Sequence, residues 1–471
     1  MKMEQEITEQ EKTEKKIGER EENKMGVMPV KKLIISMSLP MMASMLVQAL
    51  YNIVDSMFVS RIGEDALTAV SLAFPLQTLM VAVAIGTGVG VNALLSKSLG
   101  EKKFEVANRA ANAGVFLMLA SYVVFCIFGI FGTEFFFQSQ VDPSKANAGA
   151  IVEYGTGYLQ VCMIGSIGFM LEMMLERLLQ ATGKTFYTMI TQGTGAILNI
   201  ILDPILIFGY FGLPQLGIRG AAIATVIGQV VAMFLALWFN VKKNTEISLS
   251  IRKMRPHAET IRKVYWVGVP SVIMQAIGSV MTYGMNQILS PISTTAVAVF
   301  GIYFKLNSFI FMPVFGLNNG LIPIISYNYG ARKKERLIES VRFALIIAVS
   351  IMIVGLCIFL TIPDKLLLLF DASPNMLEIG VPALRIIGTH FILAGASIVF
   401  MSTFQAFGEG LLSLMVSVLR QLIMILPAAY LLTKFFGLGA VWWAFPIAES
   451  FSLSLSVFFF VRLYRTKIKM L

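Results

Sequence analysis

Four polar side chains in apolar segments could bind a small cation. Asp55 lies in one segment, Asn199 and Asp203 in a second, and Thr225 in a third. Asn199 and Asp203 are four residues apart, so they share one face of a helix. Carboxylate, amide and hydroxyl oxygens suit a hard monovalent cation such as Na⁺, whereas two close carboxylates at low dielectric could share a proton. Alternatively, both acids satisfy backbone groups freed by kinks, helped at Asp203 by Pro204.

The composition places these residues in a membrane. The chain is 56% hydrophobic and 14% charged, against roughly 45–50% and 25% in soluble domains. A span of the bilayer takes ~20 apolar residues of helix, and the ~10-residue alternation of a membrane barrel is absent. We therefore expect an all-α, polytopic membrane protein with twelve transmembrane helices. The expected spans are Leu33–Val59, Ala66–Leu94, Asn108–Phe131, Ile151–Leu179, Thr185–Phe211, Gly220–Val241, Val264–Leu289, Ala296–Ile325, Phe343–Ile362, Pro382–Phe407, Leu411–Leu432 and Gly439–Val461.

The basic residues predict the orientation. The net charge of +10 comes from Lys and Arg in alternate short connections rather than in one patch, which is typical of cytoplasmic loops and not of nucleic-acid binding. Both termini are then cytoplasmic and the protein belongs in the inner (cytoplasmic) membrane. Asp55 and Asp203 lie at similar depth in the outer half of spans 1 and 5, because both helices start on the cytoplasmic side. Residues 1–28 are expected to form a charged cytosolic tail.

An internal repeat predicts two related lobes. Sliding the chain by 230 positions places Pro40 on Pro270, Gly86 on Gly316 and Ser96 on Ser326. Six spans separate the copies, so both halves have the same topology, as in transporters built from parallel repeats. We expect an N-terminal lobe over residues 29–245 and a C-terminal lobe with a basic linker over residues 246–471. A cleft between two such lobes suits alternating access.

Other ionisable residues within the spans are functional candidates because burying them is costly. Glu449 could attract a cationic substrate or pair with Arg420, and both remain open. Lys305 has no acidic neighbour in its own helix. The two histidines and three cysteines form no metal or nucleophile–base pattern, so we expect neither an enzyme nor a cofactor.

Several motifs resemble the multidrug and toxic compound extrusion (MATE) family, and look closest to its bacterial MepA-like branch. They cover nearly all of the chain after the tail and are Val54–Val59 after Pro40, Gln180–Gly183, Asn199-x-x-x-Asp203-Pro204, Gly217–Thr225, Phe309-x-x-Met312-Pro313 and Pro323–Ala331. The resemblance implies export of cationic or amphipathic compounds driven by Na⁺ or H⁺ entry. It also assigns the coupling site to Asp55, Asn199, Asp203 and Thr225.

The resemblance also bears on the second lobe. Some branches use a carboxylate in spans 7 or 8, where this chain has Gln275, Gln287 and Lys305. We therefore expect coupling in the first lobe, with Glu449, Lys305 and Gln275 as candidates for the substrate cleft. The expected partners are small-molecule drugs and membrane lipids, and the expected state is a monomer. The alternative function is a lipid-linked oligosaccharide flippase of a distantly related family, which would need a strongly cationic cleft.

Overall fold

The described part of the chain is helical and has no strands. The computed structural model describes residues 22–141, 144, 147–250, 252, 254 and 256–471. Ten helices are long and apolar enough to cross a membrane, and two pairs of shorter helices pass the same test together. Counting each pair as one bent span gives the twelve predicted. The all-α polytopic fold is thus confirmed, while residues 1–21 of the predicted tail lie outside the described residues.

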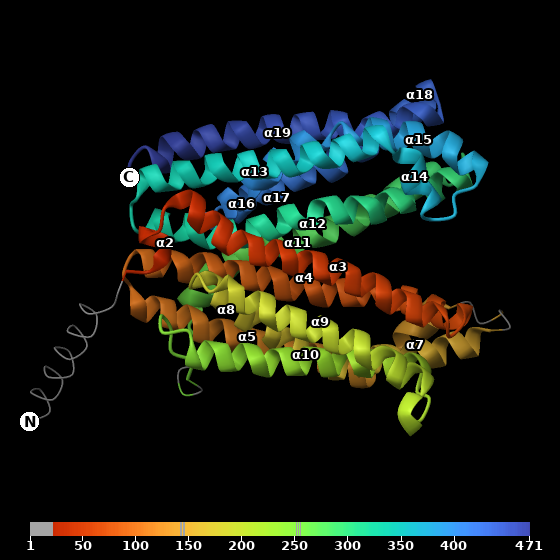
Figure 1. Cartoon of the computed structure of the whole chain (residues 1–471), viewed down its shortest axis with the longest axis horizontal. Coiled ribbons are helices and arrows are strands. Elements are labelled where there is room, and N and C mark those ends of the chain that lie inside the picture. Colours follow the sequence, from red (N-terminus) through yellow and green to blue (C-terminus); the bar gives the residue numbers. More distant parts are fainter. Residues whose placement is uncertain (1–21, 142–143, 145–146, 251, 253, 255) are drawn as a thin grey trace, which may run out of the picture.

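The helices form two groups along the chain (Figure 1). The first group comprises α2 (Lys24–Val27), α3 (Val30–Ser60), α4 (Glu64–Gly100), α5 (Phe104–Phe131), α6 (Thr133–Gln140), α7 (Ala148–Ile164), α8 (Ile167–Ala181), α9 (Thr185–Phe208) and α10 (Gly217–Lys242). The second comprises α11 (Ala258–Leu289), α12 (Thr294–Gly330), α13 (Lys334–Thr361), α14 (Pro363–Leu368), α15 (Pro374–Gly388), α16 (Phe391–Ala406), α17 (Gly410–Val418), α18 (Leu426–Phe436) and α19 (Ala444–Leu463).

Spans 4 and 10 depart from the prediction of continuous helices. α7 and α8 meet at a 43° bend, and α15 and α16 meet at a 47° bend. The breaks fall at Gly165–Ser166 and at Thr389–His390. Both lie in the fourth span of their group, so the two halves of the chain share the bend as well as the order of helices. Span 5 ends earlier than predicted, because Gly209 adopts a left-handed conformation (φ 75°) directly after Phe208 that glycine tolerates. Span 11 contains a π-helical stretch at Leu419–Ile425.

The two groups meet where repeated glycines touch the opposite group. A Cβ placed on Gly86 of α4 would lie 2.7 Å from the carbonyl oxygen of Gly268 in α11. A Cβ placed on the repeat partner Gly316 of α12 would lie 2.6 Å from the backbone nitrogen of Met42 in α3. Only glycine permits such approaches, and small residues allow close helix packing in membranes. The repeat predicted from sequence therefore builds the interface between the groups.

The same symmetry closes one end of the bundle. A Cβ on Gly100 would overlap the carbonyl oxygen of Tyr327, and a Cβ on Gly330 would overlap that of Lys97. Each contact is the other shifted by 230 positions. This end also carries α2 and the C-terminus, and α3 and α12 diverge toward the opposite end (Figure 1). We call it the α2 end.

One hydrogen bond recurs in both groups. Ser96 Oγ in α4 donates to the carbonyl oxygen of Ala181 at 2.9 Å, and Ser326 Oγ in α12 donates to that of Ala406 at 2.9 Å. Ser96 and Ser326 are one of the pairs that the 230-position offset matches. The repeat therefore preserves a contact between α4 and α8 in one group and between α12 and α16 in the other.

The segment before α3 bridges the two groups at the α2 end. Asn23 Nδ2 donates to the carbonyl oxygen of Thr182 in the first group. From the second group, Asn328 Nδ2 and Arg336 Nη2 each donate to the carbonyl oxygen of Met25 at 3.1 Å. Met25 itself is fully buried. The described part of the predicted tail is therefore an ordered bridge rather than a solvated extension.

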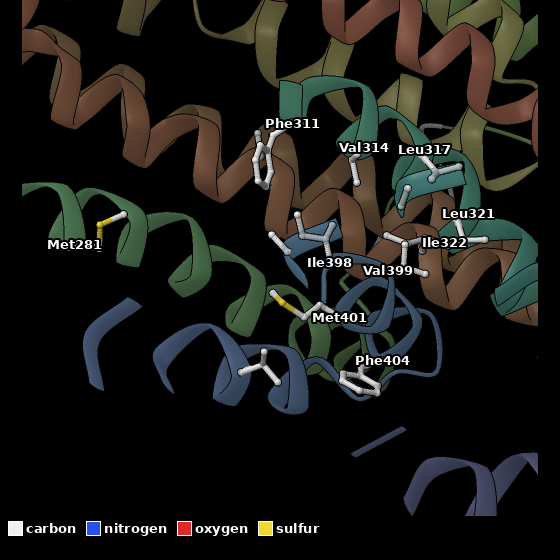
Figure 2. Close-up of a cluster of buried hydrophobic side chains, with 14 of the residues drawn as sticks. Met281, Phe311, Val314, Leu317, Leu321, Ile322, Ile398, Val399, Met401 and Phe404 are labelled. Carbon is white, nitrogen blue, oxygen red and sulfur yellow. The ribbon is translucent and has the colours of Figure 1, made fainter. Parts of the chain in front are cut away.

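The core of the second group is apolar. Figure 2 shows Leu317 and Leu321 of α12 near Val399 of α16, with Phe311 of α12 and Phe404 of α16 at opposite edges of the same cluster. All five are buried. Burial of such side chains removes apolar surface from contact with lipid or water and gains close packing. The second group thus packs large apolar side chains between α12 and α16.

Candidate functional site

The structure brings all four predicted ion-site residues together inside the first group. Asn199 and Asp203 lie on α9, and Thr225 lies on the neighbouring α10. These two helices approach closely because Gly228 has no Cβ. A Cβ at this position would lie only 2.8 Å from the carbonyl oxygen of Gly195. α3 supplies Asp55 from the other side.

Asn199 orients the cluster through hydrogen bonds on both sides. With its amide turned to satisfy both partners, Nδ2 donates to Asp203 Oδ2 at 2.9 Å and Oδ1 accepts from Thr225 Oγ1 at 3.0 Å. The orientation of an amide is assigned from such a network. The Asp55 and Asp203 carboxyls lie close enough to interact directly. A proton shared between them would let one carboxyl donate a hydrogen bond to the other.

Four further residues surround the cluster, and the sequence reasoning missed them. Tyr51 hydrogen-bonds Thr225, Gln77 Nε2 donates to the Tyr158 hydroxyl at 3.2 Å, and Cys162 Sγ accepts from Gln77 Nε2 at 3.8 Å. Spacing could have found Tyr51, which precedes Asp55 by one helical turn. No comparable sequence signal marked Gln77 on α4, or Tyr158 and Cys162 on α7, because only the fold brings these helices beside the cluster.

Asp203 and Asn199 are deeply buried and Asp55 and Thr225 are partly buried, and the two acids lack a basic partner within the described chain. Asp203 is 0% exposed and Asn199 is 3% exposed. Neither Asp55 nor Asp203 takes part in a salt bridge to Lys or Arg among the residues that the structure describes. Two carboxyls without a fixed cation must bind a proton or a mobile cation to avoid buried negative charge. The available oxygens suit either one.

A polar cavity extends from the cluster toward the α2 end of the first group. Its volume is about 100 Å³, and its walls come from α3, α8, α9 and α10. Asn199 and Thr225 line one part, while Glu172, Glu176 and Gln192 line another. A polar space of this size can hold water bound to its walls. The ion-site residues are therefore not sealed inside a dry core.

Glu449 and Arg420, whose pairing the sequence left open, face each other in the second group. Arg420 Nη1 lies 3.6 Å from Glu449 Oε2, and the side chains are 17% and 4% exposed. Glu449 Oε1 has no hydrogen-bond partner among the described residues. The π-helical turn at Leu419–Ile425 carries Arg420. The pair neutralises the charge that Glu449 would otherwise bring to this lobe.

Lys305 and Gln275 lie apart from the ion-site residues. Lys305 Nζ lies 5.7 Å from the centre of the Phe370 ring, a cation–π geometry. Gln275 is exposed on α11. Arg420 and Lys305 thus have different neighbours. They do not form the concentrated cationic site that a pyrophosphate-binding flippase would need.

The profile of the MatE family matches residues 40–205 and 270–431. The chain belongs to the MatE family. The two matched stretches begin 230 positions apart, at Pro40 and Pro270, in agreement with the repeat. The predicted resemblance is confirmed, and with it a polytopic transporter fold of twelve helices in two lobes, here called the N-terminal and C-terminal lobes. The MatE family consists of membrane transporters.

Curated relatives and solved structures agree with this assignment. The chain is 26% identical over 429 residues to the multidrug export protein MepA of Staphylococcus haemolyticus, covering 91% of this chain and 92% of the relative. It is 27% identical over 424 residues to MepA of Staphylococcus aureus strain MSSA476, covering 90% and 91%.

Two solved structures resemble it over nearly their whole length. One is described as the outward-facing conformation of a multidrug resistance MATE family transporter, with a TM-score of 0.88, 27% identity and coverage of 96% of this chain and 99% of that one. The other is a MOP superfamily transporter from Pyrococcus furiosus, with a TM-score of 0.85, 27% identity and the same coverage. This chain is thus a multi-pass membrane protein similar to multidrug exporters.

Proposed function

We propose that this chain is a secondary active multidrug efflux transporter, which exports cationic or amphipathic compounds by antiport with Na⁺ or H⁺. The observation that carries the proposal is the buried cluster of Asp55, Asp203, Asn199 and Thr225, which lacks a basic partner among the described residues. An exporter needs an energy source, and a site that must bind a cation can take that energy from an ion gradient. The names of the MepA relatives support drugs as the exported compounds.

The two-lobed arrangement suits alternating access. The lobes are in tight glycine-mediated contact at the α2 end and diverge toward the other end (Figure 1). The distribution of basic loops makes the α2 end cytoplasmic, so the present conformation corresponds to an outward-facing state of a protein in the inner membrane. Likeness to a transporter described as outward-facing supports this interpretation. We take residues 29–245 and 246–471 as the moving lobes of a monomer.

Coupling follows if the ion and the drug favour opposite states. Binding of a cation at Asp55 and Asp203 changes their charge and their direct interaction, and α9 carries that change along the N-terminal lobe. A ligand shifts a conformational equilibrium only by its difference in affinity between the two states. We place the drug in the cleft between the lobes, where Glu449, Lys305 and Gln275 remain candidate contacts.

The test is efflux of a fluorescent organic cation such as ethidium from proteoliposomes. A Na⁺ gradient and a pH gradient are imposed separately, with the membrane potential clamped. We expect one or both gradients to drive efflux by the wild-type protein and neither to drive it in Asp203→Asn. Full gradient-driven efflux by Asp203→Asn, with equal protein in the vesicles, would exclude the cluster as the coupling site.

A further inference from the structure

A second pair of carboxyls lies in the N-terminal lobe, on α8. Glu172 and Glu176 are one helical turn apart and share a face. Glu176 is 1% exposed and accepts hydrogen bonds from Thr191 Oγ1 at 2.6 Å and Gln192 Nε2 at 2.7 Å. Glu172 has no hydrogen bond among the described residues, and its Oε1 lies 3.8 Å from where a Cβ of Gly195 would be. The space left by that glycine keeps Glu172 open to the cavity.

The cavity joins this pair to the ion-site cluster. Glu172, Glu176 and Gln192 line it together with Asn199 and Thr225. α9 forms the connecting wall, because Gln192, Asn199 and Asp203 recur on one face at helical spacing. At ~1.5 Å per residue, Gln192 lies ~16 Å from Asp203 along the helix toward the α2 end. The two acid pairs therefore occupy different depths of one polar space.

Unsatisfied buried polar atoms continue the same face beyond the acid pair. Gln192 Oε1 is buried without a hydrogen-bond partner among the described residues. One turn nearer the α2 end, Thr188 is 0% exposed and its hydroxyl also lacks a described partner, as does that of the fully buried Thr185. Buried polar groups normally find a partner. Free oxygens aligned on one helix face are suited to water or a small cation passing along it.

The charges around the pair favour a cation. The nearest basic group is Arg177, but its Nη1 donates to Gln180 Oε1 and to Asn319 Oδ1, each at 2.9 Å. The guanidinium thus contacts α12 and interacts with Glu176 electrostatically, but it forms no salt bridge with that carboxylate within the described chain. The remaining polar groups that line this cavity are neutral, including Gln229 of α10 and Tyr51 of α3.

We propose that Glu172 and Glu176 form a second binding site for the coupling cation, through which it passes between the Asp55–Asp203 cluster and the cytoplasm. Glu172 takes up the cation from the cavity, and Glu176 passes it toward Thr188 and Thr185 at the α2 end. This inference rests on the proposed ion-driven antiport. The Asp55–Asp203 cluster cannot perform this step alone, because its α9 residues lie ~21–27 Å along the helix from the α2 end. The proposal assigns the step to the acid pair on α8.

The test compares coupled and uncoupled transport in proteoliposomes of the full chain. Glu172→Gln and Glu176→Gln remove the charge but keep the shape, and Glu172→Asp keeps the charge. We expect each Gln variant to slow gradient-driven ethidium efflux by about 100-fold or more, the scale of losing one positioned proton-transfer group. Exchange of ethidium between equal pools and its binding in detergent should stay near the wild-type values. Glu172→Asp should recover much of the coupled rate.

Controls separate the failure of this inference from that of the proposed function. Glu339→Gln changes an exposed acid on α13 and should leave every measurement unchanged, while Asp203→Asn should abolish coupling. Normal coupling in both Gln variants, with Asp203→Asn inactive, would overturn the relay alone. Equal losses of exchange, binding and coupled efflux would instead assign the cavity to the drug and also overturn it. Absence of gradient-driven efflux in the wild type would remove the proposed function and the relay with it.

Discussion

The two lobes share a fold but treat buried charge in opposite ways. In the N-terminal lobe Asp55 and Asp203 meet without a basic partner among the described residues, beside neutral Asn199 and Thr225. In the C-terminal lobe the buried Glu449 faces Arg420. The repeat partner of Asp55 is the fully buried Met285. The N-terminal lobe thus contains two acids with no fixed counter-charge among the described residues, whereas the C-terminal lobe pairs its buried acid with an arginine.

This difference shows how a duplicated fold can divide its work. The features that the repeat preserves are contacts between helices, namely the interface glycines and the hydrogen bonds of Ser96 and Ser326. The features that it does not preserve are the buried acids. Packing at the interface constrains both lobes alike, because each must close against the other. An ion site needs to exist only once, so the second lobe can fill the space between α12 and α16 with apolar side chains such as Leu317 and Val399 (Figure 2).

The strongest test of the comparison replaces one buried acid in each lobe. We expect Asp203→Asn to reduce gradient-driven efflux to the background of empty vesicles, because the cluster loses one of its two titratable carboxyl groups. Glu449→Gln should retain a dependence on the same gradient, even if its rate falls. Ethidium efflux against imposed ion gradients measures both. The opposite pattern, with coupling lost only in Glu449→Gln, would reverse the assignment of the lobes.

The second test asks whether Glu449 and Arg420 form a structural pair. Removing one member of a buried pair leaves an uncompensated charge and costs roughly 3–5 kcal/mol, whereas replacing both with apolar residues is often neutral. We expect Glu449→Leu and Arg420→Met each to lower thermal stability in detergent, and the double variant to regain most of the loss. Independent, additive losses would show that the two charges act separately, and would favour Glu449 as a contact for the substrate.

Much of the fold could be read from the sequence because membranes simplify the problem. Apolar length and basic loops predict the spans, and the 230-residue offset predicts which contacts recur. The bends at Gly165–Ser166 and Thr389–His390 were missed, because a kink within a long apolar segment does not interrupt its hydropathy. Asp55, Asn199, Asp203 and Thr225 could be grouped by depth and family resemblance.

Their surroundings could not be predicted in the same way. Gln77 and Tyr158 reach the cluster only because α4 and α7 pack beside it, and hydropathy carries no information about which helices are neighbours. The partner of Arg177 in the other lobe was equally hidden, since Asn319 lies 142 residues away. The sequence thus identified the acids, whereas the cavity that links Asn199 and Thr225 to Glu172 and Glu176 appears only in the folded structure.

A third test probes the symmetric part of the comparison at the α2 end. Gly100→Val and Gly330→Val each place a side chain against the backbone of the other lobe. We expect both to weaken the closed α2 end by similar amounts, about 1–3 kcal/mol as for other overpacked sites, with similar losses of stability and transport. Gly149→Ala, at a position with open space around it, is the control. A large effect in only one variant would contradict an interface built equally by both lobes.

The smallest expected effect comes from the repeated hydrogen bond. Ser96→Ala and Ser326→Ala each remove a donor to a buried carbonyl oxygen, at Ala181 and Ala406. A typical hydrogen bond contributes about 0.5–1.5 kcal/mol to stability, and the two bonds have the same length and burial. We therefore expect equal, modest decreases in thermal stability, with coupling retained in both variants. Loss of coupling in Ser96→Ala alone would mean that this hydrogen bond helps to position α8, and hence Glu172 and Glu176. A contact that both lobes share would then have a separate role in the N-terminal lobe.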